Sequence, residues 1–380
     1  MEKLNMFTLF SCYGMQEIGI KNSGLFEINN KGTSEINKDS ILANAVGNYN
    51  LTEIIKNYNF PSREEMIQEL TEKNIGFIPE KNKPYLWQKK KDDEIKKYWL
   101  ACKLTNNYGD ICNIQRLPDK TDILFSSFPC TDISVAGKMA GFNPDSKTRS
   151  SLLWETIRIL HTAKQEDNLP KYVMFENVKN LVSKKFKGQF NDLIQILEDI
   201  GYCVYWEIIN AKFCGIPQNR ERVFIVCIRK DIDTGKFKFP LPFDNGIRLK
   251  DILEDNVDEH YYLKSPKVSE LIENLIVNNT IESGYDYRIR KLTERECFIL
   301  MGLNPNGVDQ AKAMGVSASA LYKIAGNGIV TNCVELIAEN LYKAQYDSSY
   351  ICTDERNIDW SQTLGIICNN KDVVKTSDCL

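Results

Sequence analysis

The chain has 380 residues, of which 43% are hydrophobic and 26% are charged, and its formal net charge is −3. These values are typical of a globular protein large enough for two or three domains, and they exclude a fibrous or highly charged disordered chain. No stretch approaches the roughly 18 apolar residues of a membrane span, and the start does not resemble a signal peptide, so we expect a cytoplasmic protein that contacts no membrane. The 12 cysteines form no Cys-x-x-Cys pair and accompany only 2 histidines, which argues against a disulfide framework or a metal site.

The first part of the chain begins with a strand at 6–10, a helix-like stretch up to Gly24 and a second strand at 25–28. Residues 48–108 are rich in Asn and Lys and contain two weak helical patterns, at 64–72 and 92–104. We therefore predict that residues 48–108 are an insertion in the scaffold.

From residue 109 onward, apolar strand-like runs alternate with helical patterns. The strands are expected at 122–125, 172–175, 203–209 and 222–228, and the helices at 152–162 and 190–200. This alternation predicts an α/β fold with a doubly wound, mostly parallel sheet, in which the last two strands form an antiparallel edge pair. Two further helices are expected at 292–301 and 329–344, and residues beyond 350 lack clear periodicity.

A thiol and a carboxylate follow two of the predicted strands. Cys130 comes after Phe128-Pro129, and Glu176 comes directly after the strand at 172–175. An α/β enzyme can place a nucleophile and a proton donor at the carboxyl edge of one sheet by having each follow a strand. This arrangement suggests covalent chemistry on an electron-poor ring. Taken singly, Cys130 could be a packed small residue and Glu176 a helix cap.

Eight short motifs carry the functional argument further. They are Phe10-Ser11-Cys12-Tyr13-Gly14, Glu35, Gly109-Asp110-Ile111, Pro129-Cys130, Glu176-Asn177-Val178, Gln218-Asn219-Arg220-Glu221-Arg222, Arg290-Lys291-Leu292-Thr293-x-Arg295-Glu296, and Gly326-Asn327 with Val330. In this order and spacing, the chain resembles the cytosine-C5 DNA methyltransferase family, in particular its small bacterial and phage members. The resemblance covers residues 6–345 apart from the insertion, and it implies the Rossmann-like fold of S-adenosylmethionine-dependent methyltransferases.

The resemblance implies methyl transfer from S-adenosylmethionine to carbon 5 of a cytosine flipped out of double-stranded DNA, in a restriction-modification or protective system. The Cys130 thiolate would add to C6 of the ring, and Glu176 would hydrogen-bond N3 and the exocyclic amine. Arg220 and Arg222 alternate along a strand and so share a face, where they would hold the base carbonyl and the catalytic loop.

The resemblance also implies a cofactor site for S-adenosylmethionine. Its residues would be Phe10, Gly14, Glu35, Asp110, Ile111, Pro129, Leu152 and Asn327. Glu35 is placed for the ribose hydroxyls and Asp110 for the adenine amine. The chain departs from the family pattern twice: Cys12 stands where a first glycine is usual, and Thr131 stands where a glutamine usually follows the Pro-Cys pair.

Contacts to nucleic acid are expected from four residues: Ser134, Arg149, Gln218 and Arg290. The first two belong to the segment 131–149, which carries Gly137 and Gly141 and would be a mobile lid over the extruded base, or else an ordinary surface loop.

The predicted organisation has five parts. These are a catalytic and cofactor-binding domain (1–47 and 109–236), the insertion (48–108), a small target-recognition region (237–288), helices that complete the catalytic domain (289–345), and a tail (346–380). The segment 231–287 has only 57 residues, and its part 253–287 is acidic, which suits phosphate contact poorly.

Three explanations for the short recognition segment remain open. Recognition could lie in the insertion, whose lysines at 89–97 accompany Trp87, Tyr98 and Trp99; a separate recognition subunit could supply it; or specificity could be weak. The aromatic stretch could equally be an amphipathic packing helix. A monomer is the family expectation.

Two other functions also remain open. One is methylation of RNA, since one branch of the family modifies tRNA. The other is a catalytically silent relative that binds nucleic acid or a partner, an alternative motivated by Cys12, Thr131 and the small recognition region.

Overall fold

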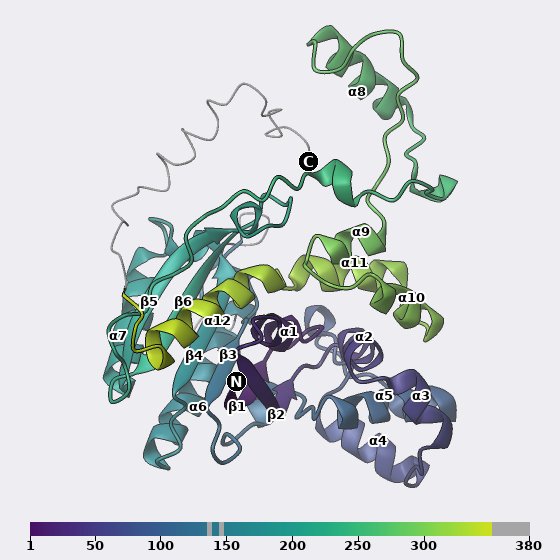
Figure 1. Cartoon of the computed structure of the whole chain (residues 1–380). Coiled ribbons are helices and arrows are strands. Elements are labelled where there is room, and N and C mark those ends of the chain that lie inside the picture. Colours follow the sequence, from purple (N-terminus) through teal and green to yellow (C-terminus); the bar gives the residue numbers. More distant parts are fainter. Residues whose placement is uncertain (135–138, 144–147, 352–380) are drawn as a thin grey trace.

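A six-stranded sheet forms the centre of the computed structural model, which describes residues 1–134, 139–143 and 148–351 (Figure 1). Most of the predicted tail and two stretches of the predicted lid, with Gly137, lie outside these residues. The strands are β1 (Glu2–Leu9), β2 (Phe26–Ser34), β3 (Ile123–Ser126), β4 (Tyr172–Val178), β5 (Tyr202–Asn210) and β6 (Glu221–Arg229). Their order in the sheet is β2-β1-β3-β4-β6-β5.

The first four strands are parallel, which confirms the predicted doubly wound α/β fold. β5 and β6 form the predicted antiparallel pair at one edge of the sheet, with β5 as the outer strand. β6 lies between β4 and β5 and is antiparallel to both. The physical reason is the unbroken apolar run 223–228, which is buried on both faces and therefore belongs inside a sheet.

Alternating side chains of the strands build two hydrophobic cores. Phe125 and Met174 face the core under α1 (Met15–Asn22) and α12 (Thr331–Tyr346). Leu124 and Phe175 face the opposite core, under α6 (Leu153–Gln165) and α7 (Lys187–Ile200). Because side chains alternate along a strand, Glu176 lies on the same face as Met174, toward α1 and α12.

The predicted insertion forms a helical layer on the α1 side. Helix α2 (Lys38–Asn48) precedes it, and its own α-helices are α3 (Leu51–Ile54), α4 (Arg63–Glu72) and α5 (Asp92–Leu104). Trp87, Tyr98 and Trp99 are all buried in the hydrophobic cluster that also contains Met6 of β1. The aromatic stretch is therefore a packing element.

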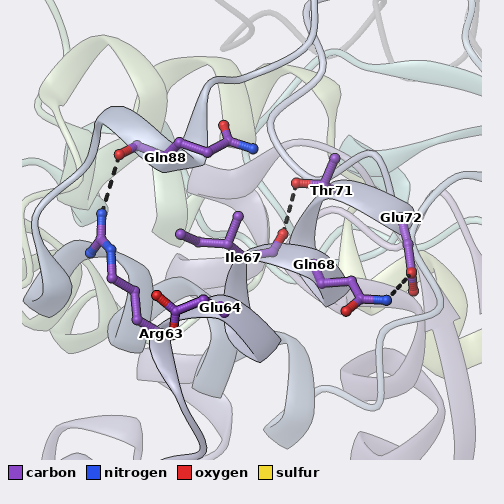
Figure 2. A pocket seen from close by; sticks show the side chains of 7 residues that line it. All are labelled: Arg63, Glu64, Ile67, Gln68, Thr71, Glu72 and Gln88. Atoms are coloured by element: carbon purple, nitrogen blue, oxygen red, sulfur yellow. Dashed lines mark hydrogen bonds between the residues drawn. The ribbon is translucent and has the colours of Figure 1, made fainter.

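An open surface pocket lies along α4 (Figure 2). It is lined by Arg63, Glu64, Ile67, Gln68, Thr71, Glu72 and Gln88. Gln68 donates a hydrogen bond to Glu72, and Arg63 donates one to the Gln88 carbonyl. None of these residues is among the predicted site residues.

Besides α12, four α-helices follow β6 in the described residues. They are α8 (Pro266–Val277), α9 (Glu294–Ile299), α10 (Asn306–Ala313) and α11 (Ala318–Asn327). α8 contains no buried residue and stands apart from the rest of the chain at the top of Figure 1. Across the residues that the structure describes, no helix has the length and apolar character needed to span a lipid bilayer.

Candidate active site

The predicted thiol and carboxylate lie at the same edge of the sheet. β3 and β4 are parallel neighbours, with Ser126 opposite Phe175, so both strands end side by side. Cys130 follows four residues after Ser126 and is half-buried, whereas Glu176 directly follows Phe175 and is only 6% exposed. The topology thus brings Cys130 and Glu176 together, as carboxyl ends of neighbouring parallel strands require.

Two asparagines downstream of Glu176 hold the segment that carries the thiol. The Asn177 side-chain amide donates a hydrogen bond of 2.9 Å to the Phe128 carbonyl, and the Asn180 amide donates one to the Ile133 carbonyl. Between these anchors, the Cys130 carbonyl accepts hydrogen bonds from two backbone N–H groups and closes a tight turn. The end of β4 therefore fixes the thiol segment on both sides of Cys130.

Sequence reasoning missed this role of both asparagines. Asn177 belongs to one of the eight motifs but has no assigned role there, and Asn180 belongs to none of them. The available signal was a pair of amide side chains three residues apart at the end of a strand.

Arg222 pairs with the buried carboxylate. In the β4–β6 ladder, Phe224 lies opposite Glu176 and Arg222 opposite Val178. The Arg222 Nε atom is 3.2 Å from the Glu176 Oε1 atom in an ion pair. Within the described part of the chain, this Oε1 atom has no hydrogen-bond partner. The carboxylate is thus charge-balanced but keeps an oxygen that can still hydrogen-bond a ligand.

Arg220 shares the face of Arg222 but reaches a different part of the chain. Its Nη2 atom donates hydrogen bonds to the carbonyls of Gly326 and Gly328, at 3.0 and 2.6 Å, where α11 ends and α12 is about to begin. Its Nε atom is buried, and no described residue accepts a hydrogen bond from it. Arg220 therefore joins the catalytic edge to the glycines on either side of Asn327.

The site electrostatics favour the neutral forms of both reacting groups. Burial raises the pKa of the Glu176 carboxyl above its ordinary 4.5, and the charges of Arg222 and Arg220 oppose this shift. Burial also raises the pKa of the Cys130 thiol, and the Glu176 charge raises it further, while the two arginines lower it. A carboxyl that keeps its proton more readily than usual is suited to donating a hydrogen bond to a ring nitrogen.

The loop after β1 has an unusual backbone, which explains how Cys12 can stand where the family usually has a glycine. Phe10 and Cys12 adopt left-handed φ angles of 57° and 49°, and Gly14 has a φ of 81°. The Cys12 backbone N–H donates a hydrogen bond of 3.0 Å to Glu35, and its thiol donates to the Ile324 carbonyl of α11 at 3.7 Å. The Cβ atom of Cys12 is therefore accommodated by a left-handed conformation that turns the thiol toward α11.

Glu35 lies directly after β2 and is held by backbone groups. Its Oε1 atom accepts hydrogen bonds from the N–H groups of Ile36 and Asn37, at 2.9 and 2.8 Å, and its Oε2 atom accepts from Cys12. Burial raises the pKa of this carboxyl, and these hydrogen bonds and the charge of Arg149 oppose the shift. The charge of Arg149, which is expected to contact nucleic acid, therefore acts on the Glu35 carboxyl.

The other predicted cofactor residues come from several parts of the chain. Asp110 accepts hydrogen bonds of 3.0 Å from the Cys112 N–H and from the Asn74 side chain, and Ile111 is buried in the cluster against which Phe10 packs. Pro129 and Leu152 are half-buried, and Asn327 is exposed at the end of α11.

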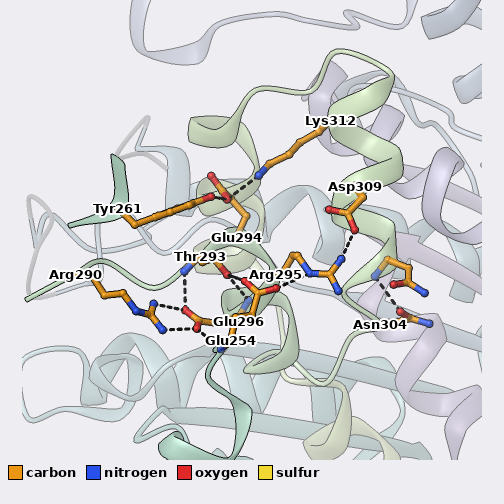
Figure 3. A network of polar contacts seen from close by, with 11 residues as sticks. Glu254, Tyr261, Arg290, Thr293, Glu294, Arg295, Glu296, Asn304, Asp309 and Lys312 are labelled. Atoms are coloured by element: carbon orange, nitrogen blue, oxygen red, sulfur yellow. Dashed lines mark hydrogen bonds and ion pairs between the residues drawn. The ribbon is translucent and has the colours of Figure 1, made fainter. Parts of the chain in front are cut away.

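The remaining predicted nucleic-acid residues make internal contacts. Gln218 donates a hydrogen bond of 3.1 Å to the Leu300 carbonyl, and Arg290 forms a two-pronged ion pair with the buried Glu296 at 2.8 and 2.6 Å. Figure 3 shows Arg290 within a polar network around the start of α9, in which Glu254 bonds to Thr293 and Arg295. Ser134 is half-buried in the turn after Cys130. A role of these residues in DNA contact stays a prediction.

Comparison with known proteins identifies the family. Residues 64–287 match the sequence model of the family described as C-5 cytosine-specific DNA methylase. The chain belongs to this family. It is 36% identical to the type II methyltransferase M2.ScrFI of Lactococcus lactis subsp. cremoris, with 90% of this chain and 100% of the relative covered.

Other relatives agree with this assignment. The type II methyltransferase M.Bsp6I of Bacillus sp. is 34% identical, with 62% of this C-5 cytosine methylase and 83% of the relative covered. Among solved structures, the Dnmt2 methyltransferase of S. pombe superimposes with a TM-score of 0.54 at 15% identity, covering 90% of this chain and 98% of that one. This structural likeness supports the Rossmann-like methyltransferase fold.

Proposed function

We propose that this family member transfers a methyl group from S-adenosylmethionine to carbon 5 of cytosine in double-stranded DNA, as the modification enzyme of a restriction-modification or protective system. The observation that carries the proposal is the placement of Cys130, Glu176 and Arg222 at one sheet edge, with the carboxylate buried and paired. The type II methyltransferase name of the relative M2.ScrFI, which this chain covers in full, supports the DNA substrate and the biological setting.

The residues around the β1 loop suit S-adenosylmethionine. β1 crosses over to β2 on one side and β3 to β4 on the other, so a ligand crevice is expected between the carboxyl ends of β1 and β3. Glu35, fixed by three backbone N–H groups, would bind the ribose hydroxyls, and Asp110 with Ile111 would hold the adenine. When bound, the cofactor would supply an electrophilic methyl group on a positively charged sulfur.

Cys130 and Glu176 would activate the cytosine together. The deprotonated sulfur adds to C6, the S–C6 bond forms, and the electron pair of the C5–C6 double bond becomes available at C5. Glu176 donates its proton toward N3 as this charge develops, and the carboxylate that results is stabilised by Arg222. After C5 is methylated, a solvent-derived base removes the C5 proton, the S–C6 bond breaks to regenerate the thiolate, and N3 returns its proton to Glu176.

The assignments of the DNA-facing parts are also proposals. Ser134 and Arg149 belong to the segment 131–149 that follows Cys130, and there they would meet a flipped base. We place target recognition in residues 237–288, because α8 contains no buried residue and so offers its side chains to a ligand. A separate recognition subunit is the alternative, and it would leave the purified chain unable to select one sequence.

Transfer of tritium from methyl-labelled S-adenosylmethionine tests the function. We expect label in duplex DNA as 5-methylcytosine and no label with a Cys130→Ala variant. Label in tRNA alone would assign the protein to RNA methylation. No label in either polymer, from a protein that still binds nucleic acid, would identify a catalytically silent relative.

A further inference from the structure

Gln16, which none of the motifs includes, lies between the ends of β1 and β3, where the ligand crevice is expected. It is the second residue of α1 and is 2% exposed. Its amide nitrogen donates hydrogen bonds to the Ser127 hydroxyl at 3.0 Å and to the Phe10 carbonyl at 3.4 Å. Because a backbone carbonyl can only accept, these contacts fix the orientation of the amide.

The oxygen end of this amide is unpartnered within the described residues. The Gln16 Oε1 atom is buried, and no described residue donates a hydrogen bond to it. Buried polar groups are nearly always hydrogen-bonded, so an unpaired acceptor at a ligand crevice indicates a donor that arrives with the ligand.

The position of Gln16 identifies which part of the ligand it meets. Phe10 follows β1 and Ser127 follows β3, so Gln16 bridges the two strand ends that define the crevice. Ser127 is also only three residues before Cys130. Gln16 therefore lies at the end of the crevice nearest the thiol.

The proposed function places the adenosine part of the cofactor at Glu35 and Asp110, so the methionine part must extend toward Cys130, where its methyl group is needed. At that end, the sulfonium has no hydrogen to donate and the carboxylate only accepts. The α-ammonium is the one donor. We propose that Gln16 Oε1 accepts a hydrogen bond from the α-ammonium of S-adenosylmethionine, an inference that rests on the proposed function.

A purely structural role would be a tether between the two loops through the amide nitrogen. These roles differ in what they predict for ligands that lack the amino-acid group. Loss of a tether weakens every adenosine ligand equally, whereas loss of the acceptor weakens only ligands that carry the ammonium.

Calorimetric titration with S-adenosylhomocysteine and with 5′-methylthioadenosine, which lacks the amino-acid group, separates the two roles. For Gln16→Met, we expect affinity for the first ligand to fall roughly 10- to 100-fold, as for a lost hydrogen bond to a charged group, and affinity for the second to stay within about threefold. Gln16→Glu keeps an acceptor and should retain the wild-type preference for S-adenosylhomocysteine or increase it.

Asn30 provides a matched control, because its Oδ1 atom is also buried and unpartnered among the described residues but lies on β2 beside Glu17. Asn30→Ala should leave the ratio of the two affinities unchanged. Equal weakening of both ligands by Gln16→Met, or a reduced preference in Gln16→Glu if Gln16→Met does not fold, would overturn the inference. Wild-type protein that binds neither ligand would instead refute the cofactor assignment itself.

Discussion

The hydrogen bond from Asn177 to the Phe128 carbonyl offers a sharp test of how the thiol is positioned. Both residues are at most 3% exposed, so Asn177→Ala leaves a buried carbonyl without its 2.9 Å donor. An unpaired buried acceptor costs about 1 to 3 kcal/mol, and we expect the free energy of unfolding to fall by about 2 kcal/mol. The thiol segment also loses one of its two asparagine anchors, and misplacement by about 1 Å can cost roughly 100-fold in rate.

Urea unfolding and single-turnover methyl transfer measure these two effects separately. Gln195→Ala is the control, because it removes an amide hydrogen bond of 3.0 Å to Asp199 that is exposed on α7. The control should lose less than about 0.5 kcal/mol and keep its full rate. If Asn177→Ala is destabilised but methylates within about threefold of the wild-type rate, Asn177 does not position the thiol.

Three further predictions concern the same edge of the sheet. Burial raises the folded-state pKa of Glu176 above 4.5, so the stability that its neutral carboxyl contributes is present below pH 4.5 and is lost as the pH rises through the folded-state pKa. The free energy of unfolding of Glu176→Gln, measured in urea, should therefore rise relative to that of the wild type between pH 4.5 and neutrality. A difference that stays constant with pH would contradict this. Since the Arg222 charge lowers the pKa of the Cys130 thiol, Arg222→Ala should slow iodoacetamide labelling of Cys130 at mildly alkaline pH, as followed by peptide mass spectrometry; unchanged labelling would count against the electrostatic coupling. Arg220→Met removes two hydrogen bonds to the carbonyls between α11 and α12 and should lower the free energy of unfolding by about 2 to 3 kcal/mol, with faster amide hydrogen exchange at that junction; protection equal to wild type would be inconsistent with this role.

The sequence predicted those parts of the fold that depend on local pattern. Apolar runs of four to seven residues between helical periods were sufficient to expect the alternating architecture, and they placed Cys130 and Glu176 at strand ends. The position of β6 inside the sheet could not be predicted in this way, because the choice of neighbouring strands depends on tertiary pairing. The short helices α10 and α11 were not predicted for a similar reason: with 8 and 10 residues they are too short to be stable alone, so their stability comes from packing against the rest of the chain.

The sequence was sufficient to predict the reacting groups of the candidate site, but not the residues that position them. A thiol and a carboxylate can be expected to react because of their chemical type. An amide such as Asn177 or Gln16 has no such signature, since the same side chain on a surface would only contact water. Its importance appears only when the partner is known, as with the Phe128 carbonyl for Asn177.

Covalent trapping tests the central claim that the Cys130 sulfur attacks a cytosine held by Glu176. Duplex DNA that contains 5-fluorocytosine should form a stable adduct with the protein in the presence of S-adenosylmethionine, because fluorine cannot leave C5 as the proton does. Mass spectrometry of the digested adduct should locate the modified nucleotide on the peptide that contains Cys130, and the Cys130→Ala variant should form none. An adduct on a different cysteine, or methylation of ordinary DNA without any trapped species, would contradict the account.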